Sequence, residues 1–486
     1  MSVSILQQLE HLGARLTRLT ADSRKVAPGV AFAAYPGERQ DGRAFIPDAI
    51  ERGGNAVLWE RANFKWHPDW RIANLGVDQL RDHVGDIASA VYGHPSEKLW
   101  MLGVTGTNGK TSVSHWLAQC LAAHGKSTAV LGTLGNGFLN TLEPAVNTTP
   151  DAIELQEKLA VYRDRGAESV AMEVSSHGLA QGRVNGVRFD VALFTNLSRD
   201  HLDYHGDMES YAAAKAKLFD MPGLRYGVIN LDDTFGQTLA ARLEKNKVSM
   251  IGYSMTGSHP NSAPVLQVQA LRFSGDGMTF EVRSPWGSGS VQAPVFGRFN
   301  AYNVSAVMGG LIASDVSFDA ATKLVGNIRP VPGRMQRLGG GQQPLVLIDY
   351  AHTPDALEKA LIAARELVSD GQLVCIFGCG GNRDKGKRPV MGEISQRLAD
   401  RVVLTSDNPR DEDPQTILND IRAGMSRDCE IVSDRGNAIA HAISGAQVGD
   451  VILIAGKGHE NYQEIRNVRT PFSDHDVAAR ALGVAA

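Results

Sequence analysis

Cysteine is scarce in this chain of 486 residues, and no two cysteines form a CxxC pair. Most of them lie in apolar runs that are typical of a protein core. This spacing favours neither a structural zinc site nor a disulfide framework, so we expect no disulfide and no bound zinc. The cysteines are Cys120, Cys375, Cys379 and Cys429.

Long apolar segments and an excess of basic residues are missing as well. No run of about 18 apolar residues occurs, and the N-terminus MSVSILQQLEHL has neither a basic leader nor an unbroken apolar segment. We therefore expect a cytoplasmic protein without a membrane partner. The formal net charge is −4 and no basic stripe suggests nucleic acid, so small molecules are the expected partners.

The length exceeds what one hydrophobic core accommodates, and a prior of ~150 residues per domain predicts about three domains. Apolar strands alternating with helical periods predict an α/β fold throughout. We expect a small N-terminal α/β domain (1–95), a central doubly wound, phosphate-loop ATPase-like domain (96–330) and a C-terminal Rossmann-like α/β domain (331–486). The last part lacks a G-x-G-x-x-G fingerprint, so its sheet alone does not imply a nicotinamide cofactor.

What the sequence does contain is a strand, a glycine-rich loop and a helix in direct succession. The apolar run Trp100–Val104 leads into TGTNGKTS, and apolar residues three or four apart follow from Ser112. Glycines let backbone N–H groups face phosphate oxygens, a lysine neutralises them and a hydroxyl can hold Mg²⁺. The general phosphate-loop motif requires glycine at position 104, so a glycine-rich turn with an incidental lysine is the alternative. The loop residues predicted to bind ATP are Gly106, Thr107, Asn108, Gly109, Lys110, Thr111 and Ser112.

Polar residues follow three further apolar runs of the central part, where ligands gather in doubly wound sheets. The turn before a helix expected near Asp151 either contacts an anion or simply caps that helix. Glu173 ends a second apolar run, where it is either a Mg²⁺ ligand or structurally paired. The third run leads into NLSRDHLDYHG, which concentrates two histidines and two aspartates.

These segments resemble the Mur ligase family, beginning with TGTNGKTS. Together with TNLxxDHLDxHG, EVSSHxLxQxR and DNPR, they keep the order and approximate spacing of the family from Ala21 to Glu460. The resemblance implies an ATP-dependent amide ligase of peptidoglycan precursor synthesis that works through an acyl phosphate and two Mg²⁺ ions. Its implied substrates are ATP, UDP-N-acetylmuramoyl-L-alanyl-D-glutamate and meso-diaminopimelate, and we expect a monomer.

The resemblance also assigns roles around ATP and the metal. Asn303 would read the adenine edge, and Arg334 and Asp349 would reach ATP from the last domain. Lys215 falls where the family has a carbamylated lysine, whereas its helix alone would suggest a solvated face. The expected metal ligands are Thr111, Glu173, His201 and carbamylated Lys215, and the expected catalytic residues are Lys110, Lys215 and His201.

The resemblance also implies which residues bind the two other substrates. For the uridine nucleotide and its muramoyl dipeptide they are Ala21, Ser23, Glu38, Arg39, Gln40, Asn147, Thr148, Thr149, Ser175, Gln181 and Arg183. For diaminopimelate they are Arg383, Asp407, Asn408, Pro409, Arg410, Gly456 and Glu460. Arg410 would grip the distal carboxylate through two hydrogen bonds, with an incidental arginine in a surface turn as the alternative.

Two other functions stay open at this point. Folylpolyglutamate synthetase shares the ATP chemistry, and a phosphate-loop ATPase could couple hydrolysis to motion. The expected uridine pocket argues against both, and phosphate release that depends strictly on a muramoyl dipeptide would separate a ligase from a motor.

Overall fold

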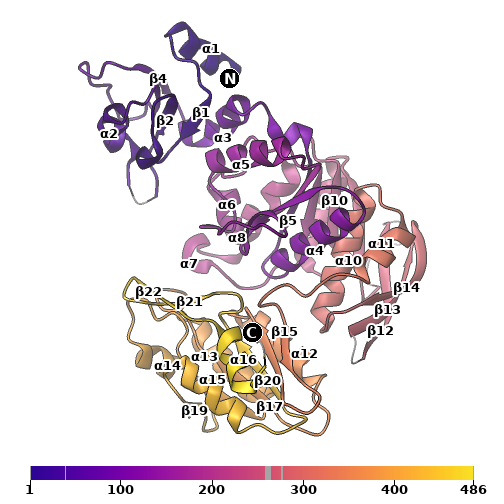
Figure 1. The fold of residues 1–486 in the computed structure, drawn as a ribbon. Coiled ribbons are helices and arrows are strands. Elements are labelled where there is room, and N and C mark those ends of the chain that lie inside the picture. The colour runs from indigo at the N-terminus through magenta and orange to yellow at the C-terminus, as the bar shows by residue number, and fades with distance from the viewer. Residues whose placement is uncertain (1, 39, 258–263, 275–276, 485–486) are drawn as a thin grey trace.

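The computed structural model describes residues 2–38, 40–257, 264–274 and 277–484. Each of its three large sheets comes from one stretch of the chain, which confirms the predicted α/β class. Figure 1 shows the central part between the N-terminal part above and the C-terminal part below. In the described residues no helix combines the length and the apolar character that a membrane crossing needs.

The N-terminal part is a four-stranded parallel sheet with its strands in sequence order. Its apolar side chains pack with helix α3 and with the start of α5 from the central part. The strands are β1 (Arg18–Thr20), β2 (Val30–Ala34), β3 (Ala56–Glu60) and β4 (Ala73–Val77), and the helices are α1 (Ser2–His11), α2 (Ile46–Glu51) and α3 (Leu80–Val91).

The central part is a ten-stranded sheet of order β14-β13-β12-β11-β10-β9-β5-β8-β6-β7. Strands β12 to β6 in this order are parallel, while β13, β14 and β7 pair in the antiparallel sense. The strands are β5 (Trp100–Thr105), β6 (Thr128–Gly132), β7 (Gly135–Phe138), β8 (Ser169–Glu173), β9 (Val191–Phe194), β10 (Tyr226–Asn230), β11 (Ser249–Ser254), β12 (Val265–Ser274), β13 (Gly277–Ser284) and β14 (Gly287–Ala293).

Helices cover both faces of the inner part of this sheet, which is why β5, β6, β8, β9 and β10 are almost entirely buried. In β5, Leu102 and Val104 pack toward α4 and α10, whereas Met101 packs toward α5. The helices are α4 (Lys110–Ala123), α5 (Ala152–Asp164), α6 (Ser176–Ala180), α7 (Leu202–His205), α8 (Met208–Ala216), α9 (Thr234–Lys245), α10 (Arg298–Ala313) and α11 (Phe318–Val325). The helix predicted from Ser112 thus begins two residues earlier, at Lys110.

The C-terminal part is a six-stranded sheet of order β15-β16-β20-β17-β18-β19, with a separate hairpin of β21 and β22. Only β15 is antiparallel to its neighbour among these six strands of the described chain. The strands are β15 (Gln336–Gly339), β16 (Leu345–Asp349), β17 (Leu373–Phe377), β18 (Arg401–Leu404), β19 (Glu430–Ile431), β20 (Val451–Ala455), β21 (Tyr462–Ile465) and β22 (Val468–Pro471). The helices are α12 (Pro354–Arg365), α13 (Lys387–Leu398), α14 (Pro414–Arg422), α15 (Arg435–Ser444) and α16 (Asp474–Leu482).

Candidate active site

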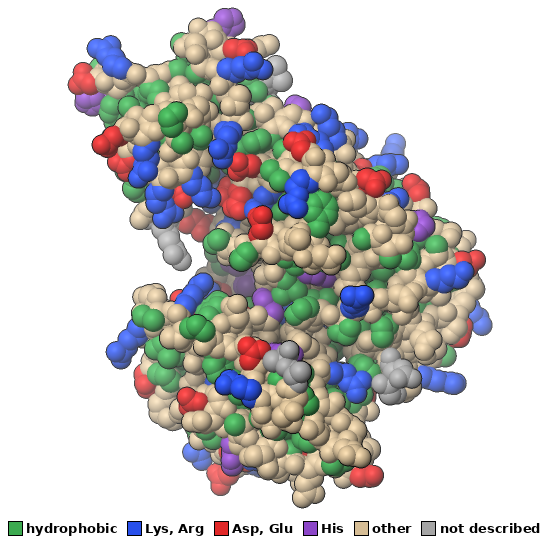
Figure 2. Space-filling view, viewed as in Figure 1, with side chains coloured by type: hydrophobic (Ala, Val, Ile, Leu, Met, Phe, Trp, Pro, Cys, Tyr) green, Lys and Arg blue, Asp and Glu red, His purple; other side chains and the backbone are tan. Residues whose placement is uncertain are grey.

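A cavity of about 1660 Å³ lies between the central and C-terminal parts. Strand ends of the central sheet and the loop before α4 form one wall, and loops of the C-terminal sheet form the other. In Figure 2 the molecule is hollowed between its N-terminal and C-terminal parts, and histidines lie on the wall of the hollow. Ligands of parallel α/β sheets bind at such strand ends.

The loop between β5 and α4 can form only with glycine at two positions. Gly106 has φ +147°, and a Cβ atom there would lie 1.9 Å from Thr195 Oγ1. Gly109 has φ +89°, and a Cβ atom there would lie 2.4 Å from Asn303 Oδ1. The buried Asn303 therefore packs directly against the loop and donates to Asn300 Oδ1 at 3.0 Å.

Two lysines approach this loop from different elements. Lys110 Nζ donates to the carbonyl oxygens of Gly106 and Thr107, both at 2.8 Å. Lys215 Nζ reaches the same Gly106 oxygen from α8 at 2.9 Å. Only 1% of Lys215 is exposed, so the alternative of a solvated helix face is wrong for this residue. Burial lowers the pKa of Lys215 well below its ordinary value, and the neighbouring charge of Lys110 lowers it further.

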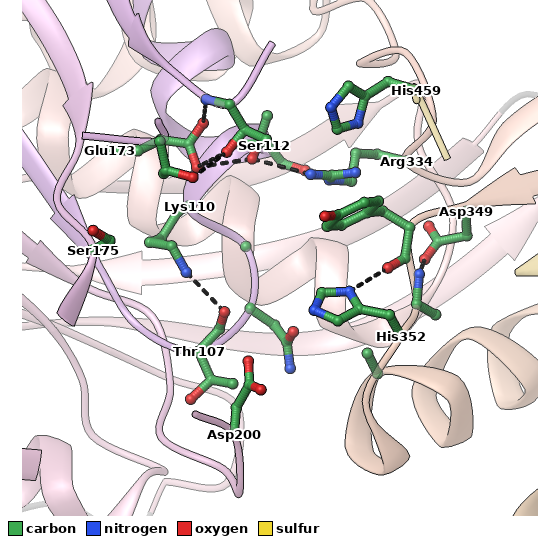
Figure 3. A pocket seen from close by; sticks show the side chains of 18 of the residues that line it. Thr107, Lys110, Ser112, Glu173, Ser175, Asp200, Arg334, Asp349, His352 and His459 are labelled. Atoms are coloured by element: carbon green, nitrogen blue, oxygen red, sulfur yellow. Dashed lines mark hydrogen bonds between the residues drawn. The ribbon is translucent and has the colours of Figure 1, made fainter. Parts of the chain in front are cut away.

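Glu173 ends β8 in a buried position next to the loop. Its Oε2 accepts hydrogen bonds from Thr111 Oγ1 at 2.9 Å and from Thr133 Oγ1 at 3.2 Å, and its Oε1 accepts from the Thr133 amide at 2.8 Å. Figure 3 shows this carboxylate facing the start of α4. The hydroxyl and carboxylate oxygens form a group of hard donors of the kind that Mg²⁺ prefers.

Arg334 extends from the C-terminal part to the phosphate loop. Its Nη2 donates to Thr111 Oγ1 at 3.1 Å, and its guanidinium lies 4.7 Å from the centre of the Tyr350 ring. Asp349 fixes the adjoining backbone by accepting from the amides of Met335 and Ala351, both at 2.8 Å. Burial raises the pKa of Asp349, and the charge of Arg334 opposes that rise.

Two histidines border the cavity next to each other: His177 in α6, after β8, and His201, after β9. His201 Nε2 lies 3.3 Å from Asp200 Oδ2, and the rings of His201 and His177 meet edge to face at 4.8 Å. Burial lowers the pKa of His201 to about 3, although Asp200 acts in the opposite direction. His201 is therefore a neutral imidazole at pH 7, the form in which histidine binds metals.

Residues predicted for the uridine substrate form a chain of contacts behind this wall. Thr149 Oγ1 donates to the Glu173 carbonyl at 2.9 Å, and Arg183 donates to the Thr149 carbonyl at 2.9 Å. Gln181 Nε2 then donates at 2.7 Å to Glu38 of the N-terminal part. The predicted members of this group that line the cavity are Asn147, Thr148, Ser175 and Arg183.

The N-terminal members of that prediction that the structure describes lie apart from the cavity. Among the residues that the structure describes, neither Ala21, Ser23 nor Gln40 belongs to the cavity wall. Ser23 is buried within its own part, and the Gln40 carbonyl closes a turn by accepting from Gly37 N at 2.8 Å. Arg39 lies outside the described residues.

The D-N-P-R turn follows β18. One part of the turn lines the cavity, and the other part lies behind the cavity wall and supports it. Arg410 lines the cavity together with Arg383 and Glu460. Asn408 lies behind them, where it donates to Glu460 Oε2 at 2.8 Å and accepts from Lys457 Nζ at 2.9 Å. The other predicted members in this supporting layer are Asp407, Pro409 and Gly456, where a Cβ atom on Gly456 would lie 2.6 Å from Asp407 Oδ2.

Several residues at the cavity were not among the predicted site residues. Asp200 and His352 belong to the RDHLD and DYAH segments, so their motifs offered a signal. Asp355 does not line the cavity but binds Asn108, which does; the sequence offered no signal for it, because its contacts depend on how two parts of the chain meet. Its Oδ2 accepts from Asn108 Nδ2 at 2.9 Å and from Ser198 Oγ at 3.1 Å.

Comparisons with known proteins agree with this geometry. Residues 15–92 match the Mur ligase family catalytic domain, residues 104–311 the Mur ligase middle domain, and residues 333–458 the Mur ligase glutamate ligase domain. The chain belongs to the Mur ligase family. The resemblance inferred from the motifs is thereby confirmed.

Individual members of the Mur ligase family match over nearly the whole chain. A UDP-N-acetylmuramoyl-L-alanyl-D-glutamate–2,6-diaminopimelate ligase from Chromobacterium violaceum is 50% identical, with 98% of this chain and 96% of the relative covered. The protein of the same name from Nitrosomonas europaea is 48% identical, with 98% and 94% covered. A solved structure of a ligase of that name superimposes with a TM-score of 0.69 at 37% identity, covering 96% of this chain and 95% of the other.

Proposed function

We propose that this Mur ligase joins meso-diaminopimelate to UDP-N-acetylmuramoyl-L-alanyl-D-glutamate at the expense of ATP, in peptidoglycan precursor synthesis. The single observation that carries the proposal is the layout of the cavity. The phosphate loop with Lys110 occupies one wall, and Arg383, Arg410 and Glu460 occupy the other. The names of the similar ligases support the same substrates.

ATP would lie along the phosphate loop. Loop amides and the N-terminus of α4 favour its phosphates, and Lys110 would neutralise charge on the β- and γ-phosphates. Asn303, which packs against Gly109, is the proposed partner of the adenine, and Arg334, which donates to Thr111, is the proposed partner of the phosphates. Asp349 would act here by fixing the backbone at Met335, which follows Arg334, and at Ala351.

The residues at the loop fit Mg²⁺. Thr111 and Glu173 offer hard oxygen donors, and neutral His201 and a carbamylated Lys215 would hold a second ion. No group of three or more His, Cys, Asp or Glu in the described chain is arranged to hold a metal by itself. This agrees with Mg²⁺ sites that depend on substrate phosphates for part of their ligands. When bound, Mg²⁺ would neutralise charge on the transferring phosphoryl group.

The proposed reaction has two steps. A carboxylate oxygen of the muramoyl dipeptide attacks the γ-phosphorus of ATP, which releases ADP and leaves an acyl phosphate. The neutral amine of diaminopimelate then attacks the acyl carbon, so that phosphate leaves and an amide bond forms. Lys110 would stabilise the transition state of the first step. A closed cavity would hold the acyl phosphate and diaminopimelate together for the second step.

Opposite charges on the far wall suit the distal end of diaminopimelate. Arg410 and Arg383 would bind its distal carboxylate, and Glu460 with the Gly456 carbonyl would hold its distal ammonium. L-Lysine lacks that carboxylate, so the arginines would discriminate between the two amino acids.

The remaining proposals concern the organisation of the protein. We propose domains at 1–95 for the uridine nucleotide, 96–330 for ATP and 331–486 for the amino acid. Glu38 reaches Gln181 of the central part, which supports a uridine site where these parts meet. A cytoplasmic monomer without nucleic-acid partner is the proposed working form.

Phosphate release tests the proposal directly. With ATP and Mg²⁺ present, phosphate should appear only when the uridine dipeptide and diaminopimelate are both added, and mass spectrometry should show the tripeptide product. Folate with glutamate serves as the control substrate pair. Phosphate release without the dipeptide, or with folate in its place, would contradict the proposal.

A further inference from the structure

The β21–β22 hairpin supports the D-N-P-R turn. Its strands pair with Glu464 opposite Arg469, and they are joined by Arg466 and Asn467 with φ of +49° and +63°. A two-residue turn of this kind matches the twist of the strands it connects. Gln463 Nε2 donates to the Asp407 carbonyl at 2.8 Å, which attaches the hairpin to the start of the turn.

The backbone of Arg410 is held by this hairpin at both its polar atoms. Arg410 has φ +52°, a left-handed conformation that a non-glycine residue keeps only when its surroundings enforce it. Its amide donates to the Glu464 carbonyl at 3.1 Å, and its carbonyl accepts from the Arg466 amide at 2.7 Å. The Glu464 amide also donates to Asn408 Oδ1 at 2.9 Å. The hairpin therefore fixes where the Arg410 side chain begins.

The Glu464 carboxylate acts on the other end of that side chain. Its Oε2 lies 3.8 Å from Arg410 Nε and 3.6 Å from Arg469 Nη2. The Glu464 side chain is 16% exposed and Arg410 22%, whereas Arg469 is 62% exposed. Arg410 Nη1 donates to the Gly381 carbonyl at 2.8 Å. Within the described chain Arg410 Nη2 has no hydrogen-bond partner, so this edge of the guanidinium is left for a ligand.

We propose that Glu464 is a positioning residue, which holds the Arg410 guanidinium so that its Nη2 edge serves the distal carboxylate of the amino-acid substrate. The inference rests on the proposed function. Without the Glu464 carboxylate, the substrate would have to order the Arg410 guanidinium when it binds. The conformational entropy lost in that step would lower the affinity for the substrate. Arg469 offsets the charge of Glu464, so that the incoming carboxylate is not repelled.

Glu464→Gln tests the role because it removes the charge and keeps the size and the backbone bonds. We expect KM for diaminopimelate to rise about tenfold, as for loss of a charge-assisted contact, with kcat within about twofold. KM for ATP and for the uridine dipeptide should stay unchanged. Glu464→Asp, which keeps the charge, should recover most of the loss. Glu430→Gln is the matched control, since Glu430 pairs with Arg401 in the same part of the chain, remote from the cavity wall.

A double-mutant cycle separates positioning from mere support of the fold. In an Arg410→Ala background, Glu464→Gln should cause no further loss of kcat/KM for diaminopimelate, because no guanidinium remains to be held. An equal fold-loss in both backgrounds, or an unchanged KM in the single variant, would overturn the inference. A wild-type enzyme that adds diaminopimelate while Glu464→Gln is silent overturns this inference alone. A wild-type enzyme that prefers L-lysine overturns the proposed function and this inference together.

Discussion

Lys110 and Lys215 donate to one and the same acceptor, the carbonyl oxygen of Gly106, at 2.8 and 2.9 Å. Two ammonium groups on one oxygen repel each other, and water that would screen them is excluded from Lys215. The repulsion between Lys110 and Lys215 is removed when Lys215 is a neutral amine, and this agrees with the lowered pKa of Lys215. A neutral amine is the form of lysine that reacts with CO₂.

We therefore predict that Lys215 is carbamylated in the active enzyme. The neutral amine adds CO₂ and releases a proton, which leaves a buried anion that can face Lys110 and Mg²⁺. Lys215→Ala should lose activity and regain part of it with acetate or formate, which can occupy the space left. Lys217→Ala, an exposed lysine two residues away, is the control and should behave as wild type. An intact mass and an electron density that show unmodified Lys215 in an active enzyme would refute the prediction.

Removal of the Lys110 ammonium should abolish ligation and leave the fold intact. Among the described residues, the Lys110 ammonium donates hydrogen bonds only to loop carbonyls, whereas its proposed task is to neutralise phosphate charge. Product formation and thermal unfolding should be measured for Lys110→Ala beside Lys245→Ala, an exposed lysine of α9. Normal turnover of Lys110→Ala with an unchanged melting curve would show that the loop lysine is dispensable.

Arg410→Ala should cripple the use of diaminopimelate. Loss of a buried charged partner typically costs ~2–5 kcal/mol, which corresponds to a fall in kcat/KM of about 30-fold to a few thousandfold. Binding of ATP and of the uridine dipeptide should change little, because Arg410 lies on the opposite wall. Arg397→Ala, on the surface of α13, is the control. Retained selectivity for diaminopimelate over L-lysine in Arg410→Ala would remove the basis of the assignment.

The ion pair of Arg388 with Glu412 should make the stability of the C-terminal part depend on pH. Hydrogen bonds from Arg388 lower the pKa of Glu412 from 4.5 to about 2. The carboxylate therefore stabilises the fold fully above pH 4.5, and this contribution is lost as the pH falls toward 2. Arg388 is fully buried, so Arg388→Met should cost about 3–5 kcal/mol, because it removes the cation that pairs with both Glu412 and Asp420.

Urea unfolding of the full chain at several pH values would check this dependence. Glu412→Gln should be less stable than wild type at pH 7, and the difference should shrink between pH 4.5 and about 2. Glu430→Gln, whose carboxylate is more exposed, should show a smaller difference. If the difference in the free energy of unfolding between wild type and Glu412→Gln did not depend on pH, the prediction would be contradicted.

Local sequence signals predicted the strands and the phosphate loop, since both depend on patterns within a few residues. The run 100–104 became β5, and Gly106 and Gly109 adopt conformations that need glycine. The burial of Lys215 could not be predicted from its helix alone, because it results from α8 packing against a loop more than a hundred residues away.

Contacts between separate parts of the chain were beyond any local pattern. The hydrogen bonds of Asp355 to Asn108 and Ser198 exist only because the C-terminal part lies against the central part. The hold of Glu464 on the D-N-P-R turn likewise depends on a hairpin that carries no recognisable motif. The resemblance supplied residues such as Arg410, but it did not supply what orients them.

The hydrogen bond of Arg334 to Thr111 would limit how much ATP is hydrolysed without forming product. Arg334 belongs to the C-terminal part and Thr111 to the phosphate loop, so the guanidinium reaches this hydroxyl only while the two parts are together. Under the proposed function, a nucleotide held by the central part alone would lack that cation. Phosphoryl transfer would thereby depend on the arrangement that also presents the amino acid, and ATP hydrolysis without product formation would be kept low.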